Sequence, residues 1–267
     1  MTDTDRYKHE QEYFDDYAAN VFDIDAINLN DIFSNNAFEN RYTRSFLENI
    51  AGKSVLDLGC GVGEDTLFLL LKGARVNAID ISPESVEVTI KLAKKFGLDH
   101  MLTAEVMTAE NLKFESDSFD IIFGREVLHH VDLDKAGKEI YRVLKKDGIA
   151  IFLEPLGYNP ILKIYRWYSR KYLKTRTDHE EPLTFNQLYD LDPRFKKIEH
   201  DEFHLISLSL WFMYSFISKG KYWWRNLQKG REYGKTYVFL QRMDRSLFRI
   251  FPFFKRYCIE TVVVYTK

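Results

Sequence analysis

The sequence predicts an α/β protein built on a doubly wound, seven-stranded, mostly parallel sheet with helical cap insertions. Three observations support this class. Short apolar runs alternate with helical stretches between residues 54 and 153, a glycine-rich loop follows the first run at 59–63, and two more strand-like runs follow at 196–206 and 258–266. Alternation of this kind joins parallel strands through crossover helices. With 267 residues, the chain is long enough for one such domain with insertions.

The first two strand and helix pairs are the most sharply delimited elements. The apolar run 54–58 enters the glycine loop, and the helix that follows at 64–72 stops at Gly73. After the strand at 75–79, Ser82 and Pro83 are typical of a helix start, because serine caps the first turn and proline is tolerated there. The other expected elements are strands near 101–106, 119–123 and 149–153, and helices at about 135–145 and 159–176.

Around this pattern the chain divides into four segments. We expect a helical cover in residues 1–50, the core of the domain in 51–154, a helical cap in 155–195, and a helical, aromatic insertion in 207–257 before the last strand. That insertion holds eleven Lys and Arg residues against Glu232 and Asp244, although the net charge of the whole chain is −2. Three uses of it remain open: a substrate lid, contact with an anionic membrane or a lipid-like ligand, and a homodimer interface.

Composition restricts the compartment and the partners. Only two cysteines occur, Cys60 and Cys258, which fits a reducing compartment. The first residues are polar and charged, unlike an export signal, and the longest apolar run, 205–218, is shorter than the roughly 20 residues of a membrane-spanning helix. We therefore expect a cytoplasmic protein. No recognised nucleic-acid reader is present, so we expect no nucleic-acid partner.

The glycine loop and the acids around it indicate the ligand. Asp80 follows the second strand about 20 residues after the loop, where a carboxylate can accept hydrogen bonds from a ribose diol. A dinucleotide site needs a third glycine where this chain has Glu64. Asp57, two residues before the first glycine, would repel a pyrophosphate but suits an ammonium group. S-adenosylmethionine carries an ammonium group and a ribose without any phosphate, so the sequence predicts it as the cofactor.

Ordered sequence blocks carry a family resemblance. They are 55–63 (VLDLGCGVG) with Asp80, 111–120, 126–131 (EVLHHV) and 139–144 (EIYRVL), within roughly residues 39–154. In these blocks the chain resembles the class I S-adenosylmethionine-dependent methyltransferases. The resemblance implies cofactor contacts from the loop and the second strand, from the segment after the third strand beside the adenine, from the end of the fourth strand, and from an N-terminal helix. The implied residues are, in that order, Asp57, Gly59, Cys60, Gly61, Gly63, Asp80 and Ile81; Ala109 and Glu110; Arg125, with Glu126 as the alternative; and Tyr13, with Tyr17 as the alternative. For Glu110, a solvated loop acid is the open alternative.

Candidate bases stand where the fourth and fifth strands end. Methyl transfer from a sulfonium is an in-line displacement, and a hydroxyl acceptor must also lose a proton. His129 and His130 follow the fourth strand and Glu154 ends the fifth, at the edge where doubly wound sheets bind ligands. Adjacent residues point in different directions, so we favour one histidine, His130, as the base. A structural role for both histidines, and a capping role for Glu154, remain open.

The expected reaction is O-methylation of a small organic molecule in small-molecule biosynthesis, giving S-adenosylhomocysteine. The paired acids of metal-dependent catechol methylation are not evident, so no metal is expected. Two alternatives remain open. One is an enzyme that uses S-adenosylmethionine in a cyclising reaction and releases methylthioadenosine, and the other is a non-catalytic module that binds the molecule without turnover.

Overall fold

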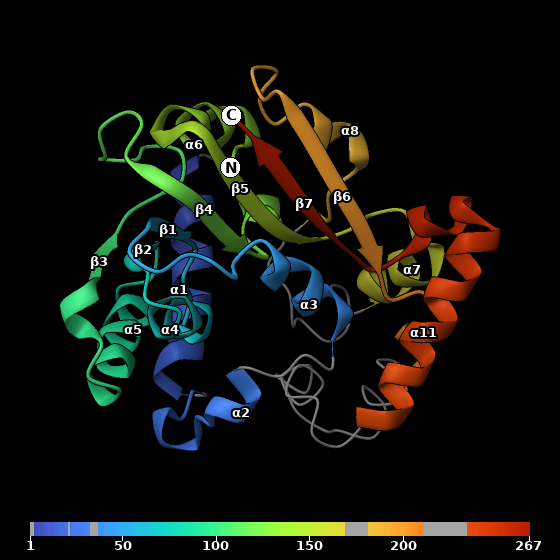
Figure 1. Ribbon diagram of the computed structural model, residues 1–267, viewed down its shortest axis with the longest axis horizontal. Coiled ribbons are helices and arrows are strands. Elements are labelled where there is room, and N and C mark those ends of the chain that lie inside the picture. Colours follow the sequence, from blue (N-terminus) through green and yellow to red (C-terminus); the bar gives the residue numbers. More distant parts are fainter. Residues whose placement is uncertain (1–2, 21, 33–36, 169–180, 211–233) are drawn as a thin grey trace.

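The computed structural model describes residues 3–20, 22–32, 37–168, 181–210 and 234–267. A seven-stranded sheet forms its centre, with helices on both faces (Figure 1). The strands are β1 (Ser54–Leu58), β2 (Arg75–Asp80), β3 (Leu102–Val106), β4 (Phe119–Arg125), β5 (Leu144–Pro155), β6 (Lys197–Phe203) and β7 (Glu260–Thr266). The helices are α1 (Asp3–Asn20), α2 (Leu29–Ile32), α3 (Phe38–Ser45), α4 (Glu64–Leu71), α5 (Pro83–Lys95), α6 (Leu133–Val143), α7 (Pro160–Tyr168), α8 (Phe185–Tyr189) and α11 (Gly234–Ile250), with short 3-10 turns η1 (Ile24–Ala26), η2 (Asp99–Met101), η3 (Leu128–His130) and η5 (Pro252–Tyr257).

The strands lie in the order β3-β2-β1-β4-β5-β7-β6. Strands β1 to β5 are parallel, and β7 is antiparallel to both β5 and β6. At the centre, Val55 of β1 pairs with Val76 of β2 on one side and with Ile121 of β4 on the other. The chain therefore reverses its direction of winding between β1 and β4, and doubly wound sheets bind ligands at the carboxyl ends of the strands at such a point. The predicted seven-stranded, mostly parallel sheet is confirmed.

Each face of the sheet has its own apolar core. In β1, Val55 contributes to the core formed with α3, α4 and α5, while Leu56 contributes to the core formed with α6 and α8. In β4, Ile121 and Ile122 divide between the two cores in the same way. Figure 1 shows α4 and α5 at the lower left of the sheet, and α6 and α8 in the upper part of the view. A sheet buried on both faces is expected for parallel strands connected by helices.

Local capping and strand pairing decide where the helices begin and end. Ser82 Oγ accepts the Ser85 N–H at 3.0 Å and Pro83 is the first residue of α5, as predicted. The predicted helix at 135–145 is wrong at its end, because α6 stops at Val143. Leu144 pairs with Phe119 of β4 and so begins β5 earlier than expected.

The predicted insertions are described in part. Of the helix expected at 159–176, the structure describes α7, and residues 169–180 lie outside the described residues. Of the aromatic insertion at 207–257, it describes the first four residues, α11 and η5, while 211–233 lie outside. Leu162 of α7 packs with Leu208 and Ile259, which places α7 beside the start of β7. No described helix combines the length and the apolar character that crossing a membrane requires.

Candidate functional site

The loop between β1 and α4 turns through left-handed glycines. Gly59 and Gly61 have φ angles of 74° and 50°, a region in which side-chain-bearing residues are strained. A Cβ built on Gly59 would lie 2.8 Å from Cγ2 of Val127, so a side chain has no room there. A Cβ on Gly61 would meet no described atom within 4 Å. The loop is therefore open at Gly61, where a ligand can approach the backbone.

Asp80, the last residue of β2, holds this loop in place. Its Oδ2 accepts the Gly61 N–H at 2.8 Å, and its Oδ1 accepts the Ser82 N–H at 2.9 Å. Burial raises the pKa of the Asp80 carboxyl, and the backbone N–H groups oppose the rise. Each carboxylate oxygen has a second lone pair, so Asp80 can accept hydrogen bonds from a diol while it orders the loop. Ile81, the next residue, is half-buried.

A second carboxylate, Asp57, lies within β1 and is 1% exposed. Its Oδ2 accepts a hydrogen bond from Thr66 Oγ1 of α4 at 2.5 Å. Burial raises the pKa of Asp57 to about 7, although the hydrogen bond from Thr66 acts in the opposite direction. Cys60 is also buried, and burial raises the pKa of its thiol well above the usual value. The thiol is therefore protonated and unreactive at neutral pH.

The segment after β3 contacts the loop between β4 and α6. Ala109 is 6% exposed and packs in the core with Met107. Glu110 Oε1 accepts the Asp132 N–H at 2.9 Å, just before α6 begins. Glu110 is half-buried and orders this loop, unlike a solvated acid.

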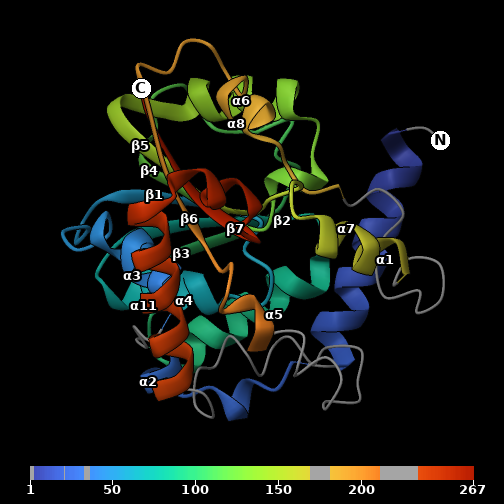
Figure 2. The same ribbon diagram turned by 90° about the vertical axis from the view of Figure 1, so that its right-hand side faces the viewer.

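Helix α1 lies against the glycine loop. Tyr17 packs with Val62 of the loop and Val88 of α5. Asp15 Oδ1 accepts the Ser82 hydroxyl at 2.5 Å, which joins α1 to the cap of α5. Both views show α1 running beside α5 (Figures 1 and 2). Helix α1 therefore closes one side of the loop.

The side chain of Arg125, the last residue of β4, is held by α3 and α4. Its Nε and Nη2 donate to the Asp65 carboxylate at 2.6 and 3.1 Å, and Nη2 also donates to Asn40 Oδ1 at 3.0 Å. Burial lowers the pKa of Arg125, but the charge of Asp65 outweighs this and raises it above the ordinary value. The sequence placed Arg125 near the cofactor. It gave no role to Asp65 or Asn40, because the partner of both residues, Arg125, lies in a strand that is distant in sequence.

Glu154 and His129 join the ends of β5 and β4. Glu154 is fully buried, and its Oε1 accepts the N–H groups of Val127 and Leu128 at 3.0 and 2.8 Å. Its Oε2 lies 2.8 Å from Nδ1 of His129. Burial raises the pKa of Glu154 to about 7, against the effect of the two backbone N–H groups. His129 is 8% exposed, so both side chains are buried. The Glu154–His129 pair therefore fixes the turn after β4.

The side chain of His130 contacts helix α1 instead of Glu154. Its Nδ1 lies 3.1 Å from Oε2 of Glu10, a carboxylate that is 4% exposed. The Phe14 ring meets the His130 ring edge to face, with 5.8 Å between centroids, and Tyr13 meets Phe14 in the same way. Sequence reasoning missed Glu10. Its spacing to Phe14 and Tyr17 is that of one helical face, which was the available signal.

Comparison with known proteins assigns this arrangement to a family. A family model described as a methyltransferase domain matches residues 56–152. The ubiquinone biosynthesis O-methyltransferase of Pelagibacter ubique is 33% identical over 184 residues, which cover 64% of this chain and 73% of that protein. The chain belongs to the class I S-adenosylmethionine-dependent methyltransferases. The resemblance found in the sequence is thus confirmed, and S-adenosylmethionine is the cofactor of the family to which the chain belongs.

Other relatives of the methyltransferase match over less of their length. The methyltransferase GfsG of Streptomyces halstedii is 36% identical over 113 residues, which cover 40% of this chain and 41% of that protein. The chain matches 37% of the length of the uncharacterized methyltransferase YcgJ of Bacillus subtilis. It matches 33% of the length of the ubiquinone biosynthesis O-methyltransferase of Methylocella silvestris. Among solved structures, phosphoethanolamine N-methyltransferase 2 of Haemonchus contortus, in complex with phosphomonomethylethanolamine and S-adenosylhomocysteine, has a TM-score of 0.59 at 19% identity and covers 96% of this chain and 60% of that one. The [4+2]-cyclase SpnF has a TM-score of 0.55 at 19% identity and covers 85 and 80%. At such identities the likeness concerns the fold alone.

The side chains at the loop of this methyltransferase fit its cofactor. The open side of Gly61 leaves room for a ligand against the backbone, and Asp80 retains lone pairs for a ribose diol. Asp57 lies buried in β1, the strand that enters the loop, and Thr66 of α4 donates a hydrogen bond to its carboxylate. The loop residues with Asp57, Asp80 and Ile81 form one group, and His129, His130 and Glu154 form a second. The Arg125 guanidinium belongs to neither, because α3 and α4 hold it.

Proposed function

We propose that this methyltransferase methylates an oxygen of a small organic molecule by in-line displacement, with His130 as the base. When bound, S-adenosylmethionine supplies the electrophilic methyl group on its sulfonium. The observation that carries the proposal is the contact between His130 Nδ1 and the buried Glu10 carboxylate. A hydroxyl acceptor must lose its proton during transfer, and a histidine oriented by a carboxylate is suited to take it.

Glu10 orients His130 through one ring nitrogen. A carboxylate at Nδ1 favours the tautomer that carries its proton there, which makes Nε2 the basic nitrogen of the ring. Phe14, one helical turn after Glu10, limits the rotation of the imidazole through its ring contact. Since both residues come from α1, the helix that lies against the glycine loop also positions the base and excludes water from it.

We assign a positioning role to His129 and Glu154. Glu154 already accepts two backbone N–H groups and faces the His129 ring, so the pair fixes the turn that carries His130. Loop residues 59–63, Asp57, Asp80 and Ile81 hold the cofactor in this proposal, with Ala109 and Glu110 beside the adenine and Tyr13 covering it from α1. The Arg125 side chain acts through Asp65, by fixing the end of β4.

Oxygen as the acceptor atom is supported by relatives. The proteins of Pelagibacter ubique and Pseudomonas syringae that match this chain at 33 and 31% identity are both described as ubiquinone biosynthesis O-methyltransferases. Helix α7 of the described cap packs beside the start of β7, next to the carboxyl end of β5 that carries Glu154.

Product analysis tests the reaction. The purified chain is incubated with S-adenosylmethionine bearing a deuterated methyl group and a panel of hydroxylated and aminated acceptors, and the products are identified by mass spectrometry. S-adenosylhomocysteine together with a deuterated methyl ether is the expected result. A deuterated amine would contradict oxygen as the acceptor atom. Methylthioadenosine would indicate the cyclising alternative, and binding without any product would indicate the non-catalytic module.

A further inference from the structure

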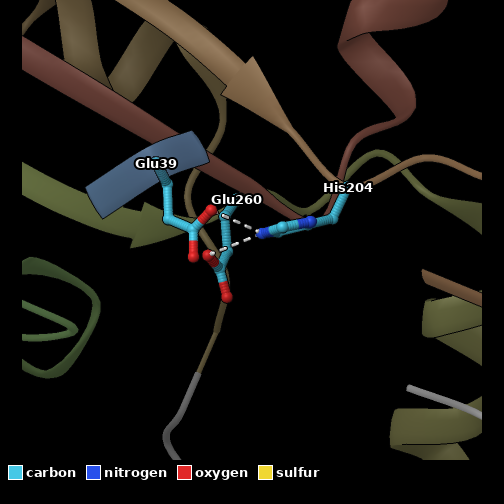
Figure 3. A group of neighbouring side chains, drawn as sticks. All are labelled: Glu39, His204 and Glu260. Atoms are coloured by element: carbon cyan, nitrogen blue, oxygen red, sulfur yellow. Dashed lines mark ion pairs between the residues drawn. The ribbon is translucent and has the colours of Figure 1, made fainter. Parts of the chain in front are cut away.

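Three side chains with metal-ligating atoms converge where α3, β6 and β7 meet. Glu39 lies in the first turn of α3, His204 directly follows β6, and Glu260 begins β7; Figure 3 shows the two carboxylates facing the same ring nitrogen. Nε2 of His204 lies 3.0 Å from Oε2 of Glu39 and 3.9 Å from Oε2 of Glu260. One ligand atom from each residue lies within 4.8 Å of the others.

The protonation of the His204 ring is set from its far side. Ser207 Oγ donates to Asp244 Oδ2 at 2.7 Å, and Nδ1 of His204 lies 3.0 Å from that Oγ. Because the Ser207 proton is used by Asp244, the serine oxygen is an acceptor for the Nδ1–H of His204. When a metal displaces the proton from Nε2, this tautomer leaves the Nε2 lone pair facing Glu39, Glu260 and the hydroxyl of Tyr237, which lies 3.2 Å from Nε2. A hydrogen bond that fixes the other ring nitrogen in this way is typical of histidines that bind metals.

The three side chains offer one electron-rich atom each to a common point, an arrangement that suits a bound cation. Glu39 and His204 are at least nine-tenths buried, and Oε2 of Glu39 makes no hydrogen bond within the described residues. A proton on Nε2 would leave this trio with a net charge of −1, whereas a divalent cation neutralises both carboxylates. Charges on neighbouring elements do not change this preference. Glu126 adds negative charge after β4, Asp244 adds it from α11, and Arg125 is already paired with Asp65.

We propose that Glu39, His204 and Glu260 form a binding site for a divalent first-row transition metal such as Zn²⁺, Mn²⁺ or Co²⁺. Imidazole together with carboxylates suits these ions, whereas Mg²⁺ and Ca²⁺ prefer oxygen ligands throughout. No metal was expected from the sequence, because the paired acids of metal-dependent catechol methylation are not evident there. Glu39, His204 and Glu260 are far apart in the chain and share no motif. Glu260 pairs with Pro155 of β5, so the site lies at the edge of the sheet that carries Glu154. This metal site has no part in the proposed reaction, and metal binding, not turnover, is measured to test it.

Titration with Co²⁺ tests the site directly. The full chain, purified without a tag and treated with a chelator, is titrated with Co²⁺, and the visible absorption bands of protein-bound cobalt are followed. We expect saturation at one equivalent, displacement of the bands by one equivalent of Zn²⁺, and no displacement by Mg²⁺. Glu39→Gln and His204→Gln should abolish the bands, and Glu260→Gln, at a strand end where the side chain is 22% exposed, should weaken binding without loss of folding.

Matched controls separate the site from the surface. His100 and Glu115 are exposed, so His100→Gln and Glu115→Gln should leave cobalt binding unchanged. Ser207→Ala removes the partner of Nδ1 and should weaken binding about tenfold or more. Circular dichroism of each variant verifies that it is folded.

A proton on Nε2 of His204 is the alternative to a bound metal ion at this site. Burial lowers the pKa of His204, but the charge of Glu39 and its contact with the ring raise it to about 9. Absence of stoichiometric cobalt or zinc binding, with NMR showing a His204 imidazolium through neutral pH, would overturn the proposal. Equal cobalt binding in wild type and in His204→Gln would overturn it as well.

Discussion

Nδ1 of His130 lies 3.1 Å from Oε2 of Glu10, and this contact joins the first helix of the chain to the turn after β4. The two residues are far apart in sequence, yet the helix that carries Glu10 and the turn that carries His130 both pack against the glycine loop. Helix α1 packs on Val62 through Tyr17, and the turn after β4 packs on Gly59 through Val127. The histidine is therefore positioned by the same packing that closes the loop.

Substitution of His130 tests the assignment of the base. His130→Gln should lower kcat about 100-fold or more and change KM little, because a general base acts on the chemical step. Glu10→Gln should lower kcat by a smaller factor, and Glu10→Asp should restore part of it. Steady-state kinetics on the acceptor identified by mass spectrometry measure these effects, with His100→Gln as the control. Unchanged kcat in His130→Gln would return the residue to a structural role.

Substitution of Asp80 tests the ribose contact. Asp80→Ala removes the acceptor of the Gly61 and Ser82 N–H groups together with the lone pairs offered to the diol. Cofactor binding should weaken by about 2 kcal/mol or more, since hydrogen bonds to charged groups are worth about 1.5–3 kcal/mol. Calorimetry with S-adenosylhomocysteine measures the change, and Asp99→Ala, at an exposed position, is the control. Equal affinity in wild type and Asp80→Ala contradicts the assignment.

Asp57 makes stability depend on pH. Its pKa is about 7 in the folded chain and 3.8 as an ordinary value, so the folded state holds a proton that the unfolded state releases. The stabilisation from this proton is complete below about pH 4 and is lost as pH rises through 7. The slope approaches about 1.4 kcal/mol per pH unit between those limits. Other buried acids titrate in the same range, so the difference between wild type and Asp57→Asn isolates the contribution.

Urea unfolding of the cofactor-free chain at pH 5, 6, 7 and 8 measures this difference. Asp57→Asn should show a smaller fall in the free energy of unfolding with pH than the wild type. Parallel curves for the two proteins would show that Asp57 has the same pKa in both states.

The pair Arg125–Asp65 should stabilise the fold. Arg125 donates twice to Asp65, and both side chains are partly exposed, at 24 and 30%. Because water screens a pair of this exposure, we expect a coupling energy of about 1 kcal/mol. A double-mutant cycle with Arg125→Gln and Asp65→Asn, followed by urea unfolding, measures it. Zero coupling together with weaker cofactor binding in Arg125→Gln would favour a role of the arginine at the cofactor instead.

The sequence predicted the parts of this methyltransferase that are local in the chain. The strand at 54–58, its glycine loop and Asp80 lie within a single βαβ unit, so their spacing alone brings them together. The placement of β7 between β5 and β6 depends on antiparallel pairing across a long insertion, which periodicity does not encode. The contacts of Glu10 with His130 and of Glu39 with His204 depend on where α1 and α3 dock. The spacing of Glu10 to Phe14 and Tyr17 marks one face of a helix but does not name the residue that the face contacts.

The clash at Gly59 allows the shape of the loop to be tested with a matched control. Gly59→Ala places a Cβ at φ 74° and 2.8 Å from Val127 Cγ2, whereas Gly52→Ala places one at φ 75° with no described atom within 4 Å. Both variants should lose about 1 kcal/mol or more to backbone strain. Gly59→Ala should lose more, and it alone should weaken cofactor binding. Val127→Ala added to Gly59→Ala removes the 2.8 Å contact with Cγ2 but keeps the Cβ at 3.1 Å and the backbone strain, so stability should return part of the way toward that of Gly52→Ala. If the double variant is no more stable than Gly59→Ala, contact with Val127 is not what requires a glycine at this position.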